Sequence, residues 1–354
     1  MNRREFIRGS AFAAAGVLTG CATGRTRAVP ADDGHFIKAA LIHLGSNMWC
    51  DAWTDNKPRP PASERWDFKD RVDHLRAEDA VWRECTEAMR ANGFNMAVID
   101  VGEALEYPSH PELKVKGSWS VGRMREELAR LREMGLEPIP KLNFSTTHNA
   151  WMKDWRYLAA TEKYDKVCAE LIDDVVDAFD GPRFFHMGHD EETIGHQGGW
   201  GHYQFIVVRK GELFWKSFRA NYDAVKAAGC RPWCFSDQIW YDRQRFIDNM
   251  PRDVIQCPWN CVADKNHPEY TESIDEMAKL GFDFIPDGST YTSKREDIAR
   301  TELPFVMDYC RKHVPLKQVL GFVVCPWVTT TSGVAKEKFI RSMEFARDQF
   351  VTWR

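Results

Sequence analysis

Two adjacent carboxylates, Asp190 and Glu191, are the residues of this 354-residue chain that point most directly to chemistry. An apolar run leads into them in the stretch 184–191, which reads Phe-Phe-His-Met-Gly-His-Asp-Glu. This pattern predicts a buried strand that carries both acids at its carboxyl end. One acid of such a pair can hold a proton while the other stabilises developing positive charge, which suits the hydrolysis of a glycosidic bond.

The rest of the chain predicts a scaffold in which short apolar segments alternate with amphipathic helices. The helical segments carry apolar residues at three-to-four spacing, and several are followed by a glycine that suits a helix C-terminus. The predicted strands are 36–44, 95–101, 137–144, 183–190, 232–237, 254–259, 283–287 and 319–326. The predicted helices lie near 78–92, 120–134, 162–179, 211–228, 242–249, 271–280, 296–313 and 334–350.

Eight strand–helix units over residues 35–354 predict a single (β/α)8 barrel of the TIM type. The active site of this α/β fold lies at the carboxyl ends of the strands. An open, doubly wound sheet is the alternative. Such a sheet usually binds a dinucleotide through a glycine-rich loop after the first strand, and the residues at 43–47, His-Leu-Gly-Ser-Asn, do not form that motif. We therefore favour the barrel, and we expect no cofactor.

Polar and aromatic side chains follow the predicted strands, where a barrel would gather them at one mouth. Sugars present apolar C–H faces that stack on aromatic rings, and hydroxyl groups that need carboxylates and amides. The candidate substrate-binding residues are Asn143, His148, His186, Asp237, Trp259, Asp287, Tyr291 and Trp327. Structural roles are the alternative, because a tryptophan can pack at the rim, a histidine can be a buried hydrogen-bonding group, and Asp237 or Asp287 can cap a helix.

The stretch 186–191 resembles the His-x-Gly-Gly-Asp-Glu motif of the family 20 glycoside hydrolases, the β-N-acetylhexosaminidases. The segment 140–148 is loosely similar to that family's Pro-Glu-x-Asp-x-Pro-Gly-His stretch, with Lys141 and Asn143 in place of the two acids. The segment 320–327 resembles the family's Leu-Gly-x…Trp ending.

The resemblance implies a substrate-assisted, retaining mechanism. Glu191 would be the general acid and base, and Asp190 would orient and polarise the 2-acetamido group of the substrate. The carbonyl oxygen of that group would attack the anomeric carbon to give an oxazoline, an exception to the usual carboxylate nucleophile. Trp259 and Trp327 would wall the sugar pocket, and Tyr291 would hydrogen-bond the acetamido oxygen.

The N-terminal segment has the composition of an export signal. The pair Arg3-Arg4 precedes a small apolar segment at 11–19, which resembles a Tat signal, and Leu-Thr-Gly-Cys at 18–21 resembles a lipobox. An uncleaved membrane anchor is the alternative, but the apolar run is shorter than the ~20 residues that span a bilayer.

We therefore expect residues 1–20 to be a Tat signal peptide, Cys21 to carry a lipid, and 22–34 to be a flexible tether before the barrel. The protein would be exported by the Tat route. It would be held by its lipid on the periplasmic or cell-surface side of a bacterial membrane. Its partners would be that membrane and a carbohydrate substrate.

Charge and histidine content define the remaining alternatives. The net charge of −4 and the absence of a basic tract argue against a nucleic-acid partner. A metal-dependent hydrolase or isomerase that uses His186, His189 and Asp190 is a second functional class, although we expect no metal. A non-catalytic, surface-tethered glycan-binding protein on the same barrel is a third.

Overall fold

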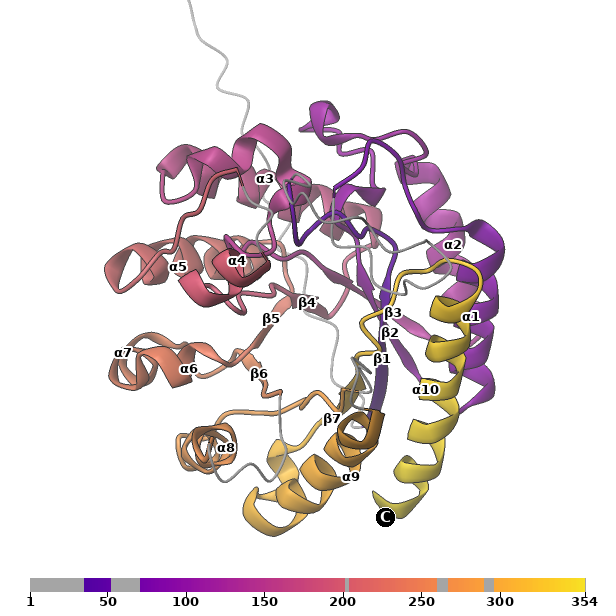
Figure 1. Ribbon diagram of the computed structural model, residues 1–354, viewed down its shortest axis with the longest axis vertical. Coiled ribbons are helices and arrows are strands. Elements are labelled where there is room, and N and C mark those ends of the chain that lie inside the picture. Colours follow the sequence, from indigo (N-terminus) through magenta and orange to yellow (C-terminus); the bar gives the residue numbers. More distant parts are fainter. Residues whose placement is uncertain (1–34, 52–70, 201–203, 260–266, 290–295, 354) are drawn as a thin grey trace, which may run out of the picture.

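The computed structural model describes residues 35–51, 71–200, 204–259, 267–289 and 296–353. These residues form a curled parallel sheet in the strand order β6-β5-β4-β3-β2-β1-β7, with helices outside it (Figure 1). The strands are β1 (Ile37–His43), β2 (Met96–Asp100), β3 (Glu137–Lys141), β4 (Phe184–His186), β5 (Arg231–Phe235), β6 (Ile255–Cys257) and β7 (Gly321–Val324). The arrangement is that of a TIM-like barrel.

The predicted strand at 283–287 is not a regular strand. This segment instead bridges β6 and β7, because Phe284 pairs singly with Gln256 and Val319, and Asp287 pairs with Val323. Pro286 lacks an N–H group, so an unbroken ladder of hydrogen bonds cannot form here. The prediction of eight regular strands was therefore wrong in this segment, although its backbone still bonds to both neighbouring strands.

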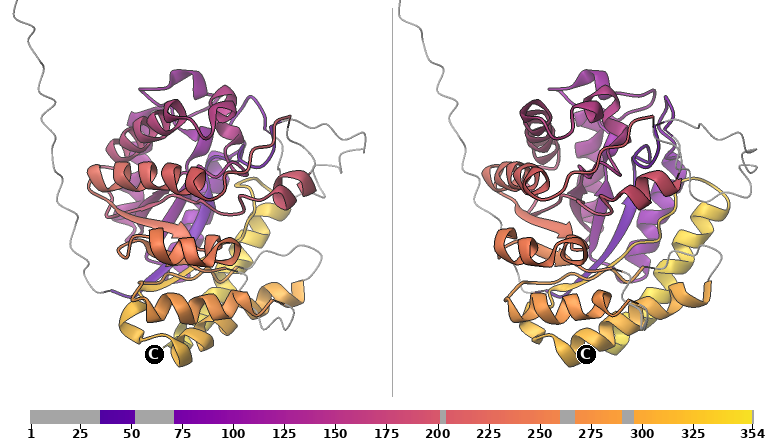
Figure 2. Two further views of the ribbon diagram at one scale, coloured as in Figure 1. Left: turned by 90° about the vertical axis from the view of Figure 1, so that its left-hand side faces the viewer. Right: turned by 60° about the vertical axis from the view of Figure 1, so that its left-hand side comes forward.

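Each predicted helix is present, and the helices form the outer layer around the strands (Figure 2). The α-helices are α1 (Asp79–Ala91), α2 (Val121–Glu133), α3 (Glu162–Ala178), α4 (Ile194–Trp200), α5 (Glu212–Ala227), α6 (Gln238–Tyr241), α7 (Arg243–Asn249), α8 (Glu269–Lys279), α9 (Glu296–His313) and α10 (Val334–Phe350). Short 3-10 helices lie at Gly102–Ala104, Pro111–Leu113, Ala150–Leu158, Leu316–Gln318 and Val351–Trp353. Sequence analysis missed the short helices α4 and α6, which lie in the connections after β4 and β5.

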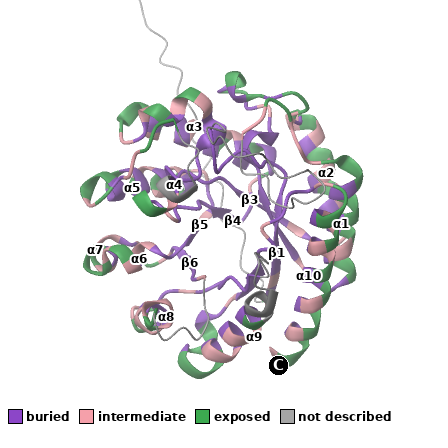
Figure 3. Cartoon of the chain, in the orientation of Figure 1, coloured by how far each residue is buried: buried purple, intermediate pink, exposed green. Residues whose placement is uncertain are grey.

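The core has two parts, one inside the ring of strands and one between the strands and the helices. Figure 3 shows that the strands are mostly buried, whereas the helices expose their outer sides. Successive residues of a strand face opposite sides, so both parts draw on the same strands. In β1, Ile37, Ala39 and Leu41 belong to the inner cluster, whereas Ala40 and Ile42 belong to the outer one. Burial on both faces explains why the strands read as near-continuous apolar runs.

The eight cysteines of the described part of the chain are buried, and all of them belong to the two apolar clusters of the core. Within the same residues, none of the helices combines the length and the apolar character needed to cross a membrane. The predicted signal, lipidation site and tether at 1–34 lie outside the described residues.

Candidate active site

The acid pair lies on a tight turn rather than on a strand. Strand β4 ends at His186, four residues before the predicted end, and the chain then turns through Gly188, His189 and Glu191 with φ values of 68°, 66° and 57°. Positive φ angles do not fit a strand, so the extended backbone stops before the acids. The turn leaves Asp190 buried, whereas Glu191 is half-buried.

Asn143, from the loop after β3, holds this turn. Its side-chain Nδ2 donates to Asp190 Oδ1 at 2.7 Å, and its Oδ1 accepts the backbone N–H of His189 at 3.1 Å. The Asn143 side chain lies directly against Gly188, where a Cβ atom would overlap it. Gly188 is therefore required twice, for its left-handed backbone and for the close approach of Asn143.

His148 lies between the two acids. Its Nε2 atom is 3.1 Å from Asp190 Oδ2 and 3.3 Å from Glu191 Oε2. Burial alone would lower the pKa of His148, but the two carboxylates outweigh burial and raise this pKa to about 9. Burial would likewise raise the pKa of Asp190, yet His148, Lys141 and Asn143 hold it well below its usual value. At neutral pH the pair is therefore an imidazolium and a carboxylate.

Asp237, which follows β5, holds the backbone of Glu191. Its Oδ2 accepts the Glu191 N–H at 2.8 Å, and the Glu191 carbonyl accepts the Thr147 hydroxyl at 2.6 Å. Burial and the charges of Asp190 and Glu191 raise the pKa of Asp237 to about 8, so this carboxyl group is protonated at neutral pH. Asp237 precedes α6 but makes no side-chain cap to it, so the capping alternative is wrong.

A second histidine reaches the outer oxygen of Glu191. His196 of α4 places its Nε2 atom 3.4 Å from Glu191 Oε1, and its Nδ1 lies 2.8 Å from the Thr193 hydroxyl. The carboxylate of Glu191 is thus flanked by His148 on the buried side and His196 on the more exposed side. Sequence analysis did not select His196 as a site residue.

The histidines of the predicted metal alternative have other partners. His189 Nε2 lies 3.1 Å from the Asn221 amide of α5, and the His189 ring packs on Phe218. The His186 ring packs on Trp233 and accepts the Gly188 N–H at 3.1 Å. Burial is the main reason that the pKa values of His186 and His189 fall to about 3, so both are neutral.

Among the described residues, the side chains that come close enough to share a metal ion are His148, Asp190 and Glu191, whose ligand atoms lie within 4.8 Å of one another. This set includes one member of the predicted trio, Asp190, but neither His186 nor His189. The metal alternative built on those two histidines is therefore not confirmed. The same three groups are already satisfied by the ion pairs described above.

Aromatic side chains surround the acid turn. The Trp327 ring packs on His43 and on Phe235, and Trp259 lies beside Trp240, with ring centroids 5.0 Å apart. The ring of Trp49, which sequence analysis did not select, meets His148 edge-on at 6.5 Å. Trp327 and Trp259 are half-buried, so part of each ring can face a ligand.

Asp287 is buried where the bridging segment meets Val323, and burial together with Glu302 raises its pKa well above the usual value. A protonated Asp287 can donate a hydrogen bond but carries no charge. Tyr291 lies outside the described residues.

Sequence analysis missed two buried ion pairs that support the site. Arg209 pairs with Glu192, the residue after the acid pair, at 2.7 Å, and it also donates to the Phe144 carbonyl at 2.9 Å. Lys141 pairs with Asp100 at 2.6 Å inside the barrel. Glu192, a third acid directly after Asp190 and Glu191, was the available signal for the Arg209–Glu192 pair. Its partner lies 17 residues later in another loop, and no local pattern indicates it.

Comparison with solved structures identifies the fold. Similar structures include the GH20 β-N-acetylhexosaminidase from Streptomyces coelicolor A3(2), with 12% identity and a TM-score of 0.56 over 86% of this chain and 63% of that one. The β-N-acetylhexosaminidase from Bacteroides fragilis NCTC 9343 gives 12% identity and a TM-score of 0.59 over 88% and 65%. A GH20 module of the pneumococcal exo-β-D-N-acetylglucosaminidase StrH gives 13% and 0.57 over 90% and 85%.

The chain shares the fold of the family 20 glycoside hydrolases. This agrees with the resemblance found in residues 186–191. The chain spans less than two thirds of the length of the Streptomyces and Bacteroides enzymes. No protein-family model matches the sequence, and no curated protein matches it. The relationship therefore rests on structure and on one short motif.

The turn at Gly188 yields a prediction with a matched control. Gly188→Ala should destabilise the protein by more than Gly93→Ala, because both glycines have positive φ but only at Gly188 would the new Cβ atom overlap a neighbour. The backbone effect alone should cost about 1–2 kcal/mol in each variant. Urea unfolding of both variants measures the difference, and equal losses would show that Asn143 does not constrain the turn.

His148 yields a prediction for the pH dependence of stability. Its pKa is raised in the folded state, so its stabilising effect is complete below the unfolded pKa of about 6.5 and is lost as pH rises through about 9. The free energy of unfolding should fall by up to about 3 kcal/mol over this range. In His148→Gln the decline should be clearly smaller. Unfolding curves at pH 6 to 9.5 test this, and parallel declines in both proteins would contradict it.

Proposed function

We propose that the protein is a retaining glycoside hydrolase that acts on N-acetylhexosamine-containing glycans by a substrate-assisted mechanism. The observation that carries the proposal is the pairing of Asp190 and Glu191 around His148 at the carboxyl end of β4. The fold shared with β-N-acetylhexosaminidases supports the same reading.

Asp190 has the properties that its proposed role needs. It is ionised, because His148 and Lys141 stabilise its negative charge, and Asn143 fixes its orientation. A fixed carboxylate can accept the N–H of a 2-acetamido group and polarise its carbonyl oxygen toward the anomeric carbon. Attack by that oxygen breaks the glycosidic bond and forms an oxazoline.

Glu191 would supply the proton for the leaving oxygen and then act as the base that activates water. Its side chain is 17% exposed, so it can reach a substrate at the mouth. His148 Nε2 lies within ion-pair distance of both acids. A proton on Glu191 would release its side of this contact, and His148 would then pair with Asp190 alone. Loss of the Glu191 proton would restore the shared arrangement.

The aromatic and polar residues around the acids would bind the sugar. Trp259 and Trp327 would wall the pocket, and Tyr291 would hydrogen-bond the acetamido oxygen. His186, Asn143 and Asp237 already make protein contacts at the base of the site. We assign these three residues to holding the catalytic groups in place. Asp287, as a protonated carboxyl group, would donate a hydrogen bond to a hydroxyl group of the sugar.

The two acids should respond differently to amide substitution. Glu191→Gln should abolish hydrolysis of aryl N-acetylhexosaminides whose leaving group needs a proton, and the effect should shrink for leaving groups that depart unaided. Asp190→Asn should lose most activity, by roughly 10²-fold or more, with the fold kept. Steady-state rates on a panel of N-acetylated and plain aryl glycosides measure both effects.

Wild-type rates in both variants would refute the assignment. The non-catalytic alternative makes a different prediction, because a glycan-binding protein would show equal affinity before and after Glu191→Gln and no turnover in either form. A thiazoline that mimics the oxazoline should inhibit the enzyme. Hydrolysis without such inhibition would point to another mechanism.

A metal-dependent hydrolase is the second candidate, because His148, Asp190 and Glu191 form a group that could bind a metal ion. The chemistry of the set fits a divalent cation, since it combines imidazole and carboxylate ligands. Metal content of the purified protein and activity after chelation separate the two candidates. Full activity of metal-free protein would favour the glycosidase.

We further propose that the protein reaches its substrate outside the cytoplasm. The twin arginine and the lipobox at Cys21 support Tat export and lipid attachment. Cys21→Ala should move the protein from the membrane fraction to the soluble fraction of the producing cells, and Arg3→Lys/Arg4→Lys should block export. Fractionation with antibody detection measures both outcomes, and an unchanged distribution would contradict the proposal.

A further inference from the structure

A series of aromatic rings leads away from the acid turn across the outside of the barrel. The Trp259 ring lies 5.0 Å from Trp240 of α6, which lies 4.5 Å from Tyr270 of α8, which in turn stacks on His267 at 5.1 Å. Ser273 holds Trp240 by accepting its indole N–H at 3.1 Å. The rings of Trp240 and Tyr270 are half-buried, and His267 is exposed. The series is therefore fixed in place and partly open to solvent.

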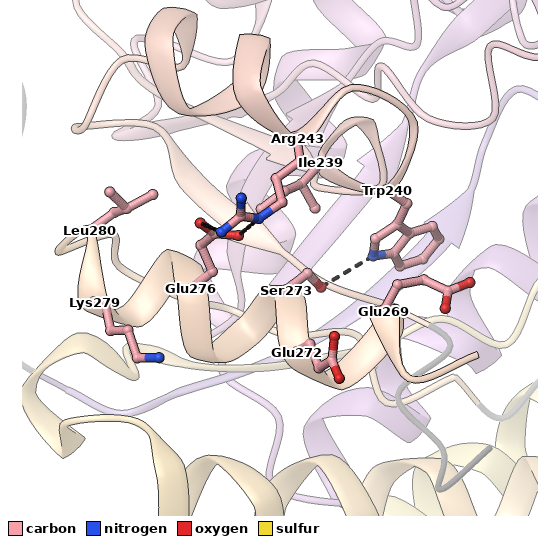
Figure 4. Close-up of a pocket in the computed structure, with 9 residues that line it drawn as sticks. All are labelled: Ile239, Trp240, Arg243, Glu269, Glu272, Ser273, Glu276, Lys279 and Leu280. Atoms are coloured by element: carbon pink, nitrogen blue, oxygen red, sulfur yellow. Dashed lines mark hydrogen bonds and ion pairs between the residues drawn. The ribbon is translucent and has the colours of Figure 1, made fainter. Parts of the chain in front are cut away.

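A cavity of about 400 Å³ adjoins this series between α6–α7 and α8 (Figure 4). Trp240 forms one wall, and Glu269, Glu272 and Glu276 line it from α8. Arg243 reaches across from α7 to pair with Glu276 (Figure 4). This volume falls within the range of about 300–1,000 Å³ typical of small-molecule sites.

The part of the cavity that Trp240 lines lies at the same end of the barrel as the acid turn, and the cavity continues along α8 to Lys279 and Leu280. Each helix that follows a parallel strand begins near the carboxyl end of that strand. The N-terminal residues of α8, and Trp240 next to them, therefore lie at the mouth. Tyr241, the neighbour of Trp240, is 45% exposed. The Trp240 backbone N–H donates to the Asp237 carbonyl at 2.9 Å, and the Asp237 side chain accepts the Glu191 N–H at 2.8 Å, so α6 is bonded to the acid turn through Asp237.

We infer that the surface from Trp259 over Trp240 to this cavity is a second carbohydrate-binding site, which holds the sugars of an extended glycan that lie beyond the bond cleaved. This inference rests on the proposed function, and it specifies that the substrate is an oligosaccharide rather than a single sugar. Half-exposed rings beside carboxylates match the apolar faces and hydroxyl groups of sugars. The ring contact between Trp259 and Trp240 makes this surface continuous with the proposed sugar pocket.

The charged side chains that line the cavity indicate which class of glycan would bind there. The three glutamates of α8 outnumber Arg243 and Lys279, so the lining carries net negative charge. A sulfated or sialylated chain would be repelled. The glycan that fits is neutral or carries free amino groups.

The test compares short and long substrates. Trp240→Ala should lower kcat/KM by about tenfold for an N-acetylhexosamine oligomer of four sugars, since it removes one stacking surface. The same variant should stay within about twofold of wild type on an aryl N-acetylhexosaminide, which does not reach the cavity. Trp353→Ala is the matched control, because Trp353 is also half-buried but packs on Phe36 at the opposite end of the barrel.

Binding measurements keep the test independent of catalysis and of any folding defect in Trp240→Ala. In the Glu191→Gln background, affinity for N-acetylhexosamine oligomers by calorimetry should rise from one sugar to four. Adding Glu272→Gln, a change at an exposed position, should reduce the affinity for four sugars by about threefold and leave that for one sugar unchanged.

The possible outcomes separate this inference from the proposed function. The second site would be overturned, even if aryl glycosides are hydrolysed, by an affinity that does not increase with the length of the glycan. It would also be overturned if neither Trp240→Ala nor Glu272→Gln reduces the affinity for four sugars. Length-dependent binding without hydrolysis would support the second site and refute the glycosidase. Tighter binding of a sulfated oligomer than of the neutral one would refute the assignment to neutral glycans.

Discussion

The buried charge of His148 is the interaction on which the rest of the site depends. Asp190 and Glu191 are adjacent in sequence and both lie against the interior of the barrel, so their negative charges would repel each other and lose hydration. An imidazolium between them offsets both effects, and Asp237 avoids adding a third charge by holding a proton. The cluster is therefore near electrical balance even though it contains three carboxyl groups.

This balance requires contributions from three neighbouring strands. The loop after β3 supplies Asn143 and His148, the turn after β4 supplies the acid pair, and the end of β5 supplies Asp237. In the sheet these strands are adjacent, in the order β5-β4-β3. Parallel pairing brings their carboxyl ends to one edge, so groups that are 47 residues apart in sequence meet within hydrogen-bonding distance.

The sequence predicted the fold well because its signals are local. Apolar runs and amphipathic helices placed the strands and helices, and the motif at 186–191 located the acid pair. What it could not predict depends on contacts between distant residues. The turn at Gly188 is shaped by Asn143 from another strand, the pairing of Glu192 with Arg209 joins two loops, and the segment at 283–287 is irregular because Pro286 interrupts its hydrogen bonds.

The three buried histidines of the site show why residue type alone does not define a role. His148, His186 and His189 are all fully buried, yet His148 is charged and the other two are neutral. Burial disfavours the charged form of each. Only His148 contacts two carboxylates, and this decides its protonation, whereas Lys141 and Arg209 add positive charge near His186 and His189 respectively. A histidine that follows a strand can therefore be a structural residue or a catalytic partner, and which one it becomes depends on whether the fold brings an acid to it.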